Sequence, residues 1–272
     1  MELALDLAVL QGDQLSADLN ISGGTTYSRI DDMGTLSEIA VRRTRRHVEG
    51  YPLAAQFERK VVSADWVTGP GGAVTNVQCD GGTGADGRRM GGVPVPCAAA
   101  PRVWWGRQSE PTWTMQASPT VTIRQNLRLS ALFYAQGGNM VGSDALYNAE
   151  IAWVNTYKAQ VNDDLLYVAQ KSVAPPALGY YNGGYAKLRE VSLSYTLPAQ
   201  LAGRIGASQA SVSIAGRNMG ILWQEQKLSY LAGGQTGDPE KNNIPTEEFT
   251  GEPTSGTMPP SSSIVATVRV SF

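Results

Sequence analysis

The chain has 272 residues, of which 42% are hydrophobic and 17% charged, and its net charge at pH 7 is −2. The charged fraction lies below the roughly 25% of ordinary globular domains. No apolar run reaches the roughly 18 residues that a spanning helix needs, so any membrane crossing must use strands. The near-neutral charge gives no electrostatic basis for a nucleic-acid partner.

The first 28 residues predict a β-hairpin. Apolar and polar residues alternate over 2–10 and again over 15–28, and a short polar turn with one glycine separates the two runs. The N-terminus has no basic region, continuous apolar core or small-residue cleavage site of a signal peptide. Because an exported protein needs such a signal, we expect this sequence to be the C-terminal part of a longer chain.

Residues 29–110 are expected to be irregular. The β-like piece Pro52–Trp66 is placed in this long connection rather than among the main strands. A basic run, Arg42–His47, is interpreted as a solvated loop surface, and contact with anionic headgroups or an acidic ligand is the alternative.

Two cysteines, Cys79 and Cys97, lie in the Gly- and Pro-rich stretch 69–101. A pair alone does not make a zinc site. In an oxidising compartment the two thiols would close a loop, which contributes about 3 kcal/mol in the chain-entropy model. We therefore expect a disulfide here, limiting the freedom of a connection too rich in glycine to fold by burying a core.

The remaining strands are expected at 112–123, 127–136, 184–197, 209–219 and 261–272. One or two short helices are predicted within 143–171, and a modest turn over 199–208. The last strand places five apolar residues on one face: Ile264, Ala266, Val268, Val270 and Phe272. Its length of about ten residues and its alternation are typical of a transmembrane β-strand.

Short and long connections alternate strictly along these seven strands. The short ones are at 11–14, 124–126 and 198–208, and the long ones at 29–110, 137–183 and 220–260. Transmembrane barrels have short turns on one side and long loops on the other. The predicted fold class is therefore all-β, an antiparallel portion of a transmembrane β-barrel with about seven strands and long external loops. The alternative is a soluble or surface β-sandwich used for adhesion or glycan binding.

Four stretches carry a family resemblance. They are Tyr185–Pro198, Val212–Met219, Gly237–Glu240 and Glu49–Leu53, and they read YAKLREVSLSYTLP, VSIAGRNM, GDPE and EGYPL. In order along most of the chain they resemble the corresponding motifs of SusC/RagA-type TonB-linked outer-membrane proteins, the TonB-dependent receptors.

The resemblance implies a barrel of about 22 strands filled by a plug. It also implies an outer-membrane location in the lipid bilayer, a SusD-like surface lipoprotein and the TonB complex as partners, and import of oligosaccharides or peptides. Residues 1–272 would form the C-terminal part of this barrel, without the plug, the TonB box or the carboxypeptidase-like extension. Because the loops of the family vary, no ligand-binding residue is carried over.

The sequence offers no support for an enzyme. It has one histidine, His47, and neither clustered metal ligands nor a nucleophile motif. We therefore expect no catalytic, cofactor-binding or metal-binding residues and no cofactor. Three tryptophans, Trp104, Trp105 and Trp113, are interpreted as membrane-interface anchors or core residues, with stacking on sugars near the pore mouth as the alternative.

Overall fold

The computed structural model describes residues 1–41, 44–142, 144–151, 156–174, 177–226 and 261–272. The motif Gly237–Glu240 lies outside the described residues. No helix among the described residues is long and apolar enough to cross a membrane, a finding that concerns helical spans only.

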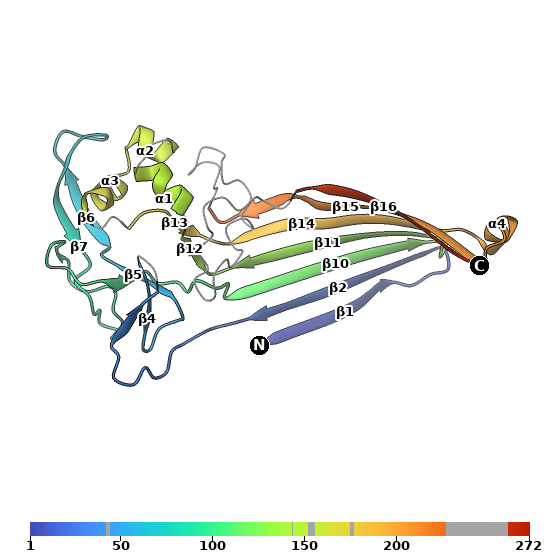
Figure 1. Cartoon of the computed structure of the whole chain (residues 1–272), viewed down its shortest axis with the longest axis horizontal. Coiled ribbons are helices and arrows are strands. Elements are labelled where there is room, and N and C mark those ends of the chain that lie inside the picture. Colours follow the sequence, from blue (N-terminus) through green and yellow to red (C-terminus); the bar gives the residue numbers. More distant parts are fainter. Residues whose placement is uncertain (42–43, 143, 152–155, 175–176, 227–260) are drawn as a thin grey trace.

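Seven long strands form one antiparallel sheet (Figure 1). They are β1 (Glu2–Leu10), β2 (Leu15–Thr25), β10 (Trp113–Ile123), β11 (Leu127–Gly137), β14 (Tyr185–Thr196), β15 (Gln209–Gln224) and β16 (Ser263–Ser271). Their order in the sheet is their order in the chain. The prediction of seven antiparallel strands is confirmed, with β15 extending to Gln224 rather than ending at residue 219.

The described strands form an open sheet rather than a closed barrel. β1 and β16 are its two edges. The alternative of a β-sandwich requires two long sheets packed face to face, whereas all seven long strands belong to one sheet.

Local chemistry explains the tight turn between β10 and β11. Arg124 and Gln125 both have positive φ, 49° and 61°, which is the backbone of turns that match the twist of a hairpin. The Asn126 side chain then donates to the carbonyl of Thr196 at 2.9 Å. This bond joins the turn to the end of the neighbouring strand β14.

The predicted turn at 199–208 contains a short helix, α4 (Ala199–Arg204). Pro198 precedes the helix, and Gly206 with φ of 74° follows it, the usual arrangement of proline at a helix start and glycine beyond its end. Three buried alanines, Ala202, Ala207 and Ala210, pack the helix against the start of β15. The interpretation as a simple turn was therefore wrong.

Two long connections, 29–110 and 138–184, lie together at one end of the sheet, and we call them the loop layer (Figure 1). Its strands are β3 (Glu38–Ala40), β4 (Arg45–Val48), β5 (Ala55–Glu58), β6 (Val61–Trp66), β7 (Val74–Cys79), β8 (Val95–Pro96), β9 (Val103–Trp104), β12 (Met140–Gly142) and β13 (Tyr180–Asn182). Its helices are α1 (Asp144–Ile151), α2 (Tyr157–Val161) and α3 (Leu165–Ser172). The sequence predicted one or two short helices within 143–171, whereas the structure has α1, α2 and α3 there.

The expectation that 29–110 is irregular and has no core was wrong. β3, β4, β5 and β9 form a four-stranded sheet, and β6, β7 and β8 form a three-stranded one. The buried residues Val48, Ala55, Phe57 and Trp104 form one core. A second core joins Val61, Cys79 and Ala100 to Ala169 and Val173 of the helical connection. As predicted, the piece Pro52–Trp66 stays outside the seven-stranded sheet.

The basic run is not a solvated surface in its described part. Arg42 and Arg43 lie outside the described residues, but Arg45 and Arg46 are only 1% and 8% exposed. Arg45 donates to Ser109 and to the carbonyl of Ala54, and Arg46 pairs with Glu38 at 3.1 Å. β4 is an inner strand between β3 and β5, and nearby acceptors bind the Nη1 groups of both arginines.

Candidate functional site

One face of the seven-stranded sheet is continuously apolar. Because neighbouring strands are in register, apolar residues of different strands align in rows across the sheet. Two such rows are Ala17, Val121, Leu129, Leu193, Ile214, Ala266 and Leu15, Ile123, Leu127, Tyr195, Val212, Val268. β1 extends the pattern by pairing Leu5 with Ile21 and Leu7 with Leu19. We call this surface the apolar face.

The apolar face is uncovered. Large side chains on each of its strands are exposed, for example Val212 to 39% and Val268 to 68%, while Leu19, Ile21, Val121 and Leu127 are half-buried. Contiguous apolar surface of this extent is unusual on a soluble monomer and marks contact with a membrane or another protein. An eleven-residue strand such as β10, tilted by about 40°, is about 28 Å tall, which matches an apolar band of about 25 Å.

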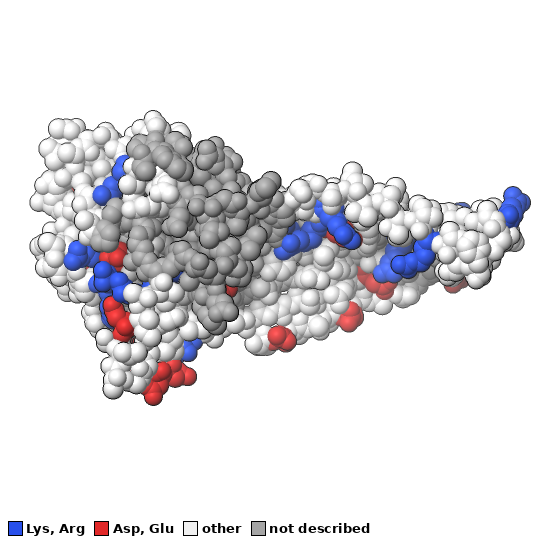
Figure 2. Space-filling model, in the orientation of Figure 1, with Lys and Arg blue, Asp and Glu red and all other residues white. Residues whose placement is uncertain are grey.

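The opposite face, which we call the polar face, carries the alternate residues. One of its rows runs Ser16, Thr122, Arg128, Ser194, Ser213, Thr267. Side chains on this face hydrogen-bond across strands: Ser130 and Ser192 are 2.7 Å apart, and Arg217 pairs with Glu190 at 3.1 Å. Figure 2 shows scattered basic and acidic groups along the strands. Such a face suits contact with water or a hydrated interior.

The three tryptophans occupy different environments. Trp104 is 5% exposed and contacts the ring of Tyr51 at 5.5 Å, so it is a core residue of the loop layer. The Trp105 indole N–H donates to the Glu58 carbonyl at 3.2 Å. Trp113 is 37% exposed on the apolar face, at the first residue of β10, which is where an interface anchor would lie.

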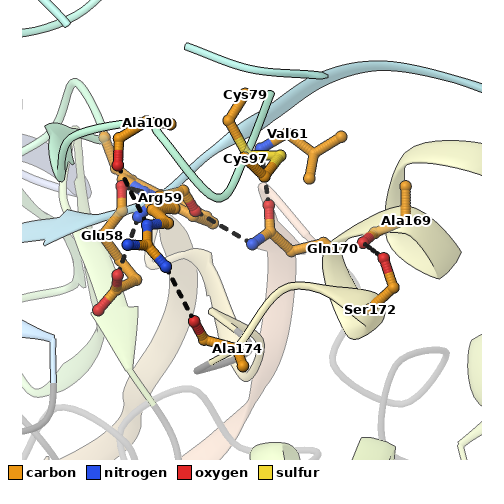
Figure 3. Close-up of a disulfide and its surroundings, with 11 residues drawn as sticks. Glu58, Arg59, Val61, Cys79, Cys97, Ala100, Ala169, Gln170, Ser172 and Ala174 are labelled. Atoms are coloured by element: carbon orange, nitrogen blue, oxygen red, sulfur yellow. Dashed lines mark hydrogen bonds between the residues drawn. A yellow bond between two sulfur atoms is a disulfide. The ribbon is translucent and has the colours of Figure 1, made fainter. Parts of the chain in front are cut away.

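Cys79 and Cys97 are joined by a disulfide that spans 18 residues and links β7 to the segment after β8 (Figure 3). Beside it, Gln170 of α3 accepts a hydrogen bond from Val61 N–H at 2.9 Å and donates to the Arg59 carbonyl at 3.1 Å. The Arg59 guanidinium donates to the carbonyls of Ala100 and Ala174. These bonds connect the two halves of the loop layer, which are more than a hundred residues apart in the sequence.

A cavity of about 300 Å³ lies between these halves. Its wall contains the charged residues Lys60, Glu150, Lys158 and Asp164, and the aromatic residues Trp105, Tyr167 and Tyr180. A larger hollow of about 570 Å³ lies over β1, β2 and β10, but Glu2 is the one charged residue in its lining. The smaller cavity is therefore lined by more charged side chains than the larger hollow.

Burial raises the pKa of Glu150 to about 6, although the hydrogen bond from Gly179 N–H and the charges of Lys158 and Lys171 oppose the rise. Burial also raises the pKa of Tyr167, and the negative charge of Glu150 adds to this rise. Partial burial of Asp164 disfavours its ionised form, but hydrogen bonds from Lys158 and Tyr167 N–H outweigh it and lower its pKa. Asp164 is also the N-cap of α3.

Sequence reasoning missed this cavity. Its residues come from four separate segments, and none forms a recognisable motif. His47, the single histidine, accepts a hydrogen bond from Ala54 N–H at 3.2 Å and lies away from the cavity lining. Among the described residues, no three His, Cys, Asp or Glu side chains are grouped as metal ligands.

Solved structures of a peptide importer share this fold. The chain aligns with one of the RagAB peptide importer in the "closed-closed" state (TM-score 0.65, 17% identity) and one in the "open-open" state (0.64, 16%). A third, of the RagAB peptide transporter, gives 0.62 and 18%. The likeness is one of fold. No family profile and no curated protein matches the chain.

These alignments cover 100% of this chain but 29%, 28% and 29% of the importer chains. The chain thus spans less than a third of the length of the solved chains that it resembles. The regular sheet and the loop layer are both included in the alignment.

Proposed function

We propose that this chain is part of an outer-membrane nutrient importer of the TonB-linked type. The observation that carries the proposal is the pair of contrasting faces, apolar and polar, maintained in register across seven strands. A barrel wall needs one lipid-facing and one lumen-facing side chain in alternation. The similarity in fold to RagAB chains supports the same function.

In this proposal the sheet is a section of the wall of a larger barrel, and the lipid bilayer covers the apolar face. The loop layer lies outside the cell, and the polar face lines the passage. Further strands and a plug from the same polypeptide would complete the barrel, whose full complement in this family is about 22 strands. The transported nutrient would be an oligosaccharide or a peptide, with no enzymatic step and no cofactor.

Two partners are implied by the family resemblance. A SusD-like surface lipoprotein would cover the loop layer, and the TonB complex would supply the driving force from the inner membrane. The name RagAB belongs to a peptide importer, which favours peptides over oligosaccharides as the nutrient to test first.

Cysteine labelling tests which face contacts lipid. Leu129, 47% exposed on the apolar face, and its neighbour Ser130 on the polar face are replaced one at a time by cysteine in the complete importer in its native membrane. A bimane fluorophore on Leu129→Cys should be quenched by doxyl lipids, whereas the same fluorophore on Ser130→Cys should be quenched by aqueous iodide. Equal aqueous quenching of both would contradict the proposal and favour a soluble sheet.

A further inference from the structure

The cavity in the loop layer contains a buried acid without a counter-ion. Glu150 is 5% exposed, and its Oε2 accepts a hydrogen bond from Gly179 N–H at 2.8 Å. Within the described residues no cationic group lies within ion-pair distance of it. Burying a carboxylate in this way costs several kcal/mol, so this arrangement is more readily explained by a ligand than by stability.

Of the three lysines near Glu150, one forms an ion pair with another acid, and the other two contact aromatic rings. Lys158, on α2, pairs with Asp164 at 2.9 Å and lies 4.6 Å from the centre of the Tyr167 ring. Lys171, on α3, lies 5.5 Å from the same ring. Lys60, which precedes β6, lines the cavity but has no carboxylate partner among the described residues. Among the described residues that line the cavity, Glu150 and Lys60 are thus the acid and the base without an ion-pair partner.

Aromatic rings form another part of the wall. The rings of Trp105 and Tyr180 lie with centroids 5.8 Å apart, and both residues line the cavity. The Lys60 ammonium lies 6.0 Å from the Trp105 ring centre. Aromatic faces attract ammonium groups and pack against short aliphatic chains, so they complement a small organic ion better than an inorganic one.

We propose that this cavity binds a small zwitterion, whose primary ammonium group pairs with Glu150 and whose carboxylate pairs with Lys60. A volume of about 300 Å³ is at the lower end for ligand sites and suits a molecule of this size. The inference concerns binding and is independent of transport, so it is tested by binding to the purified complete importer.

Titration calorimetry with 6-aminohexanoate provides the test, because its flexible chain adapts to the spacing of the two charges. Two matched probes each lack one charge: 6-acetamidohexanoate has no ammonium, and 6-aminohexanamide has no carboxylate. We expect the zwitterion to bind at least about tenfold more tightly than either matched probe, because each matched probe forms one ion pair fewer with the wall of the cavity.

Two substitutions assign the ends of the ligand. Glu150→Gln keeps an oxygen that accepts from Gly179 N–H, so the fold is retained, but it should abolish the preference for the zwitterion over 6-acetamidohexanoate. Lys60→Gln should abolish the preference over 6-aminohexanamide. The control Asp163→Asn changes an exposed acid of the same connection that does not line the cavity, and it should leave all three affinities unchanged.

Acid should weaken binding. Glu150 loses its charge as the pH falls through its raised pKa of about 6, so its attraction for the ligand ammonium disappears. Lys60, Lys158, Lys171 and Asp164 are the other charged groups around it. Binding of 6-aminohexanoate should fall at least about fivefold from pH 7.5 to pH 5. The proposal is overturned if the zwitterion fails to bind at up to about 10 mM, or if the three probes bind equally.

Discussion

The sheet and the loop layer bury their residues in opposite ways. In the sheet, regular alternation leaves large apolar residues such as Ile214 and Val268 exposed to 51% and 68%. In the loop layer, charged residues such as Arg45 and Glu58 are each 1% exposed. The sheet therefore requires an apolar solvent or partner outside the molecule, whereas the loop layer buries charged groups beside internal partners, such as Ser109 for Arg45 and Arg102 for Glu58. One region thus leaves apolar side chains exposed, and the other encloses charged side chains in a core.

The largest expected effect concerns the open edges of the sheet. β1 and β16 each present unpaired N–H and C=O groups, and every such group costs several kcal/mol in hydrocarbon. The chain of residues 1–272 alone should therefore aggregate or assemble in detergent rather than form a stable monomeric barrel. Size-exclusion chromatography with light scattering measures this. A monodisperse, heat-resistant monomer would contradict it, whatever the behaviour of the loop layer.

A charge on the sheet should discriminate between its faces. Leu193→Arg places a cation on the apolar face and should destabilise the membrane-inserted protein by about 2–4 kcal/mol. Its neighbour Ser194 points to the polar face, so Ser194→Arg should cost less than about 1 kcal/mol. Urea unfolding of the complete importer in lipid vesicles gives both values. Equal costs at the two positions would mean that the apolar face does not contact lipid.

The regular sheet was predictable because each strand carries its own signal. Alternation over 127–136 defines both faces of β11 without reference to any distant residue, and strictly alternating connection lengths indicate which loops share an end. The bulges in β14, such as that opposite Leu132 and Phe133, left no such signal. Neither did the late end of β15, because the alternation stops there: Ile221, Leu222 and Trp223 are three consecutive apolar residues.

The loop layer was not predictable because its contacts join distant segments. The strands β8 and β9 have two residues each, too few to show a period. The core that contains Cys79 is completed by Ala169 and Val173, about 90 residues later. A basic run such as Arg45–Arg46 resembles a solvated surface in sequence, since its acceptors Ala54, Ser109 and Glu38 are not its neighbours. The cavity around Glu150 was missed for the same reason.

Removal of the disulfide should affect the loop layer and not the sheet. Replacing Cys79 and Cys97 by serine opens a closed loop of 18 residues, which should lower the stability of the loop layer by about 3 kcal/mol. Limited proteolysis should then cut within 61–100 sooner, while the long strands stay protected. If the wild type and the double serine variant are cut within 61–100 at the same rate, the disulfide contributes nothing to the stability of the loop layer.

The same bond reports on the compartment. If the loop layer lies outside the cell, both thiols of protein from the native host should be blocked against alkylation under non-reducing conditions. Two freely alkylated cysteines would indicate a reducing environment and would contradict the proposed orientation of the sheet. This measurement concerns only the location of the loop layer, so it is independent of the proteolysis result.

The smallest effect concerns the pH dependence of the loop layer. Glu150 keeps its proton up to a pH of about 6 in the native state but only to about 4.5 when unfolded. Between these values the native state binds more protons, so the free energy of unfolding should decrease as the pH rises through this window, by about 2 kcal/mol at most. Asp164, whose pKa is lowered from 3.8, loses its contribution only below this window.

Hydrogen exchange of the amides of α1 and α3, corrected for the intrinsic effect of pH on exchange, measures this change at pH 4.5 and pH 7. Glu150→Gln should remove it, because the amide cannot ionise, and the variant should be more protected than the wild type at pH 7. Asp163→Asn should retain the wild-type dependence. Amides of the long strands should show no matching change, since the hydrogen bond to Glu150 comes from Gly179 of the loop layer. A change shared by the sheet and the loop layer would mean that the two regions unfold as one unit. It would contradict a pH response confined to the loop layer.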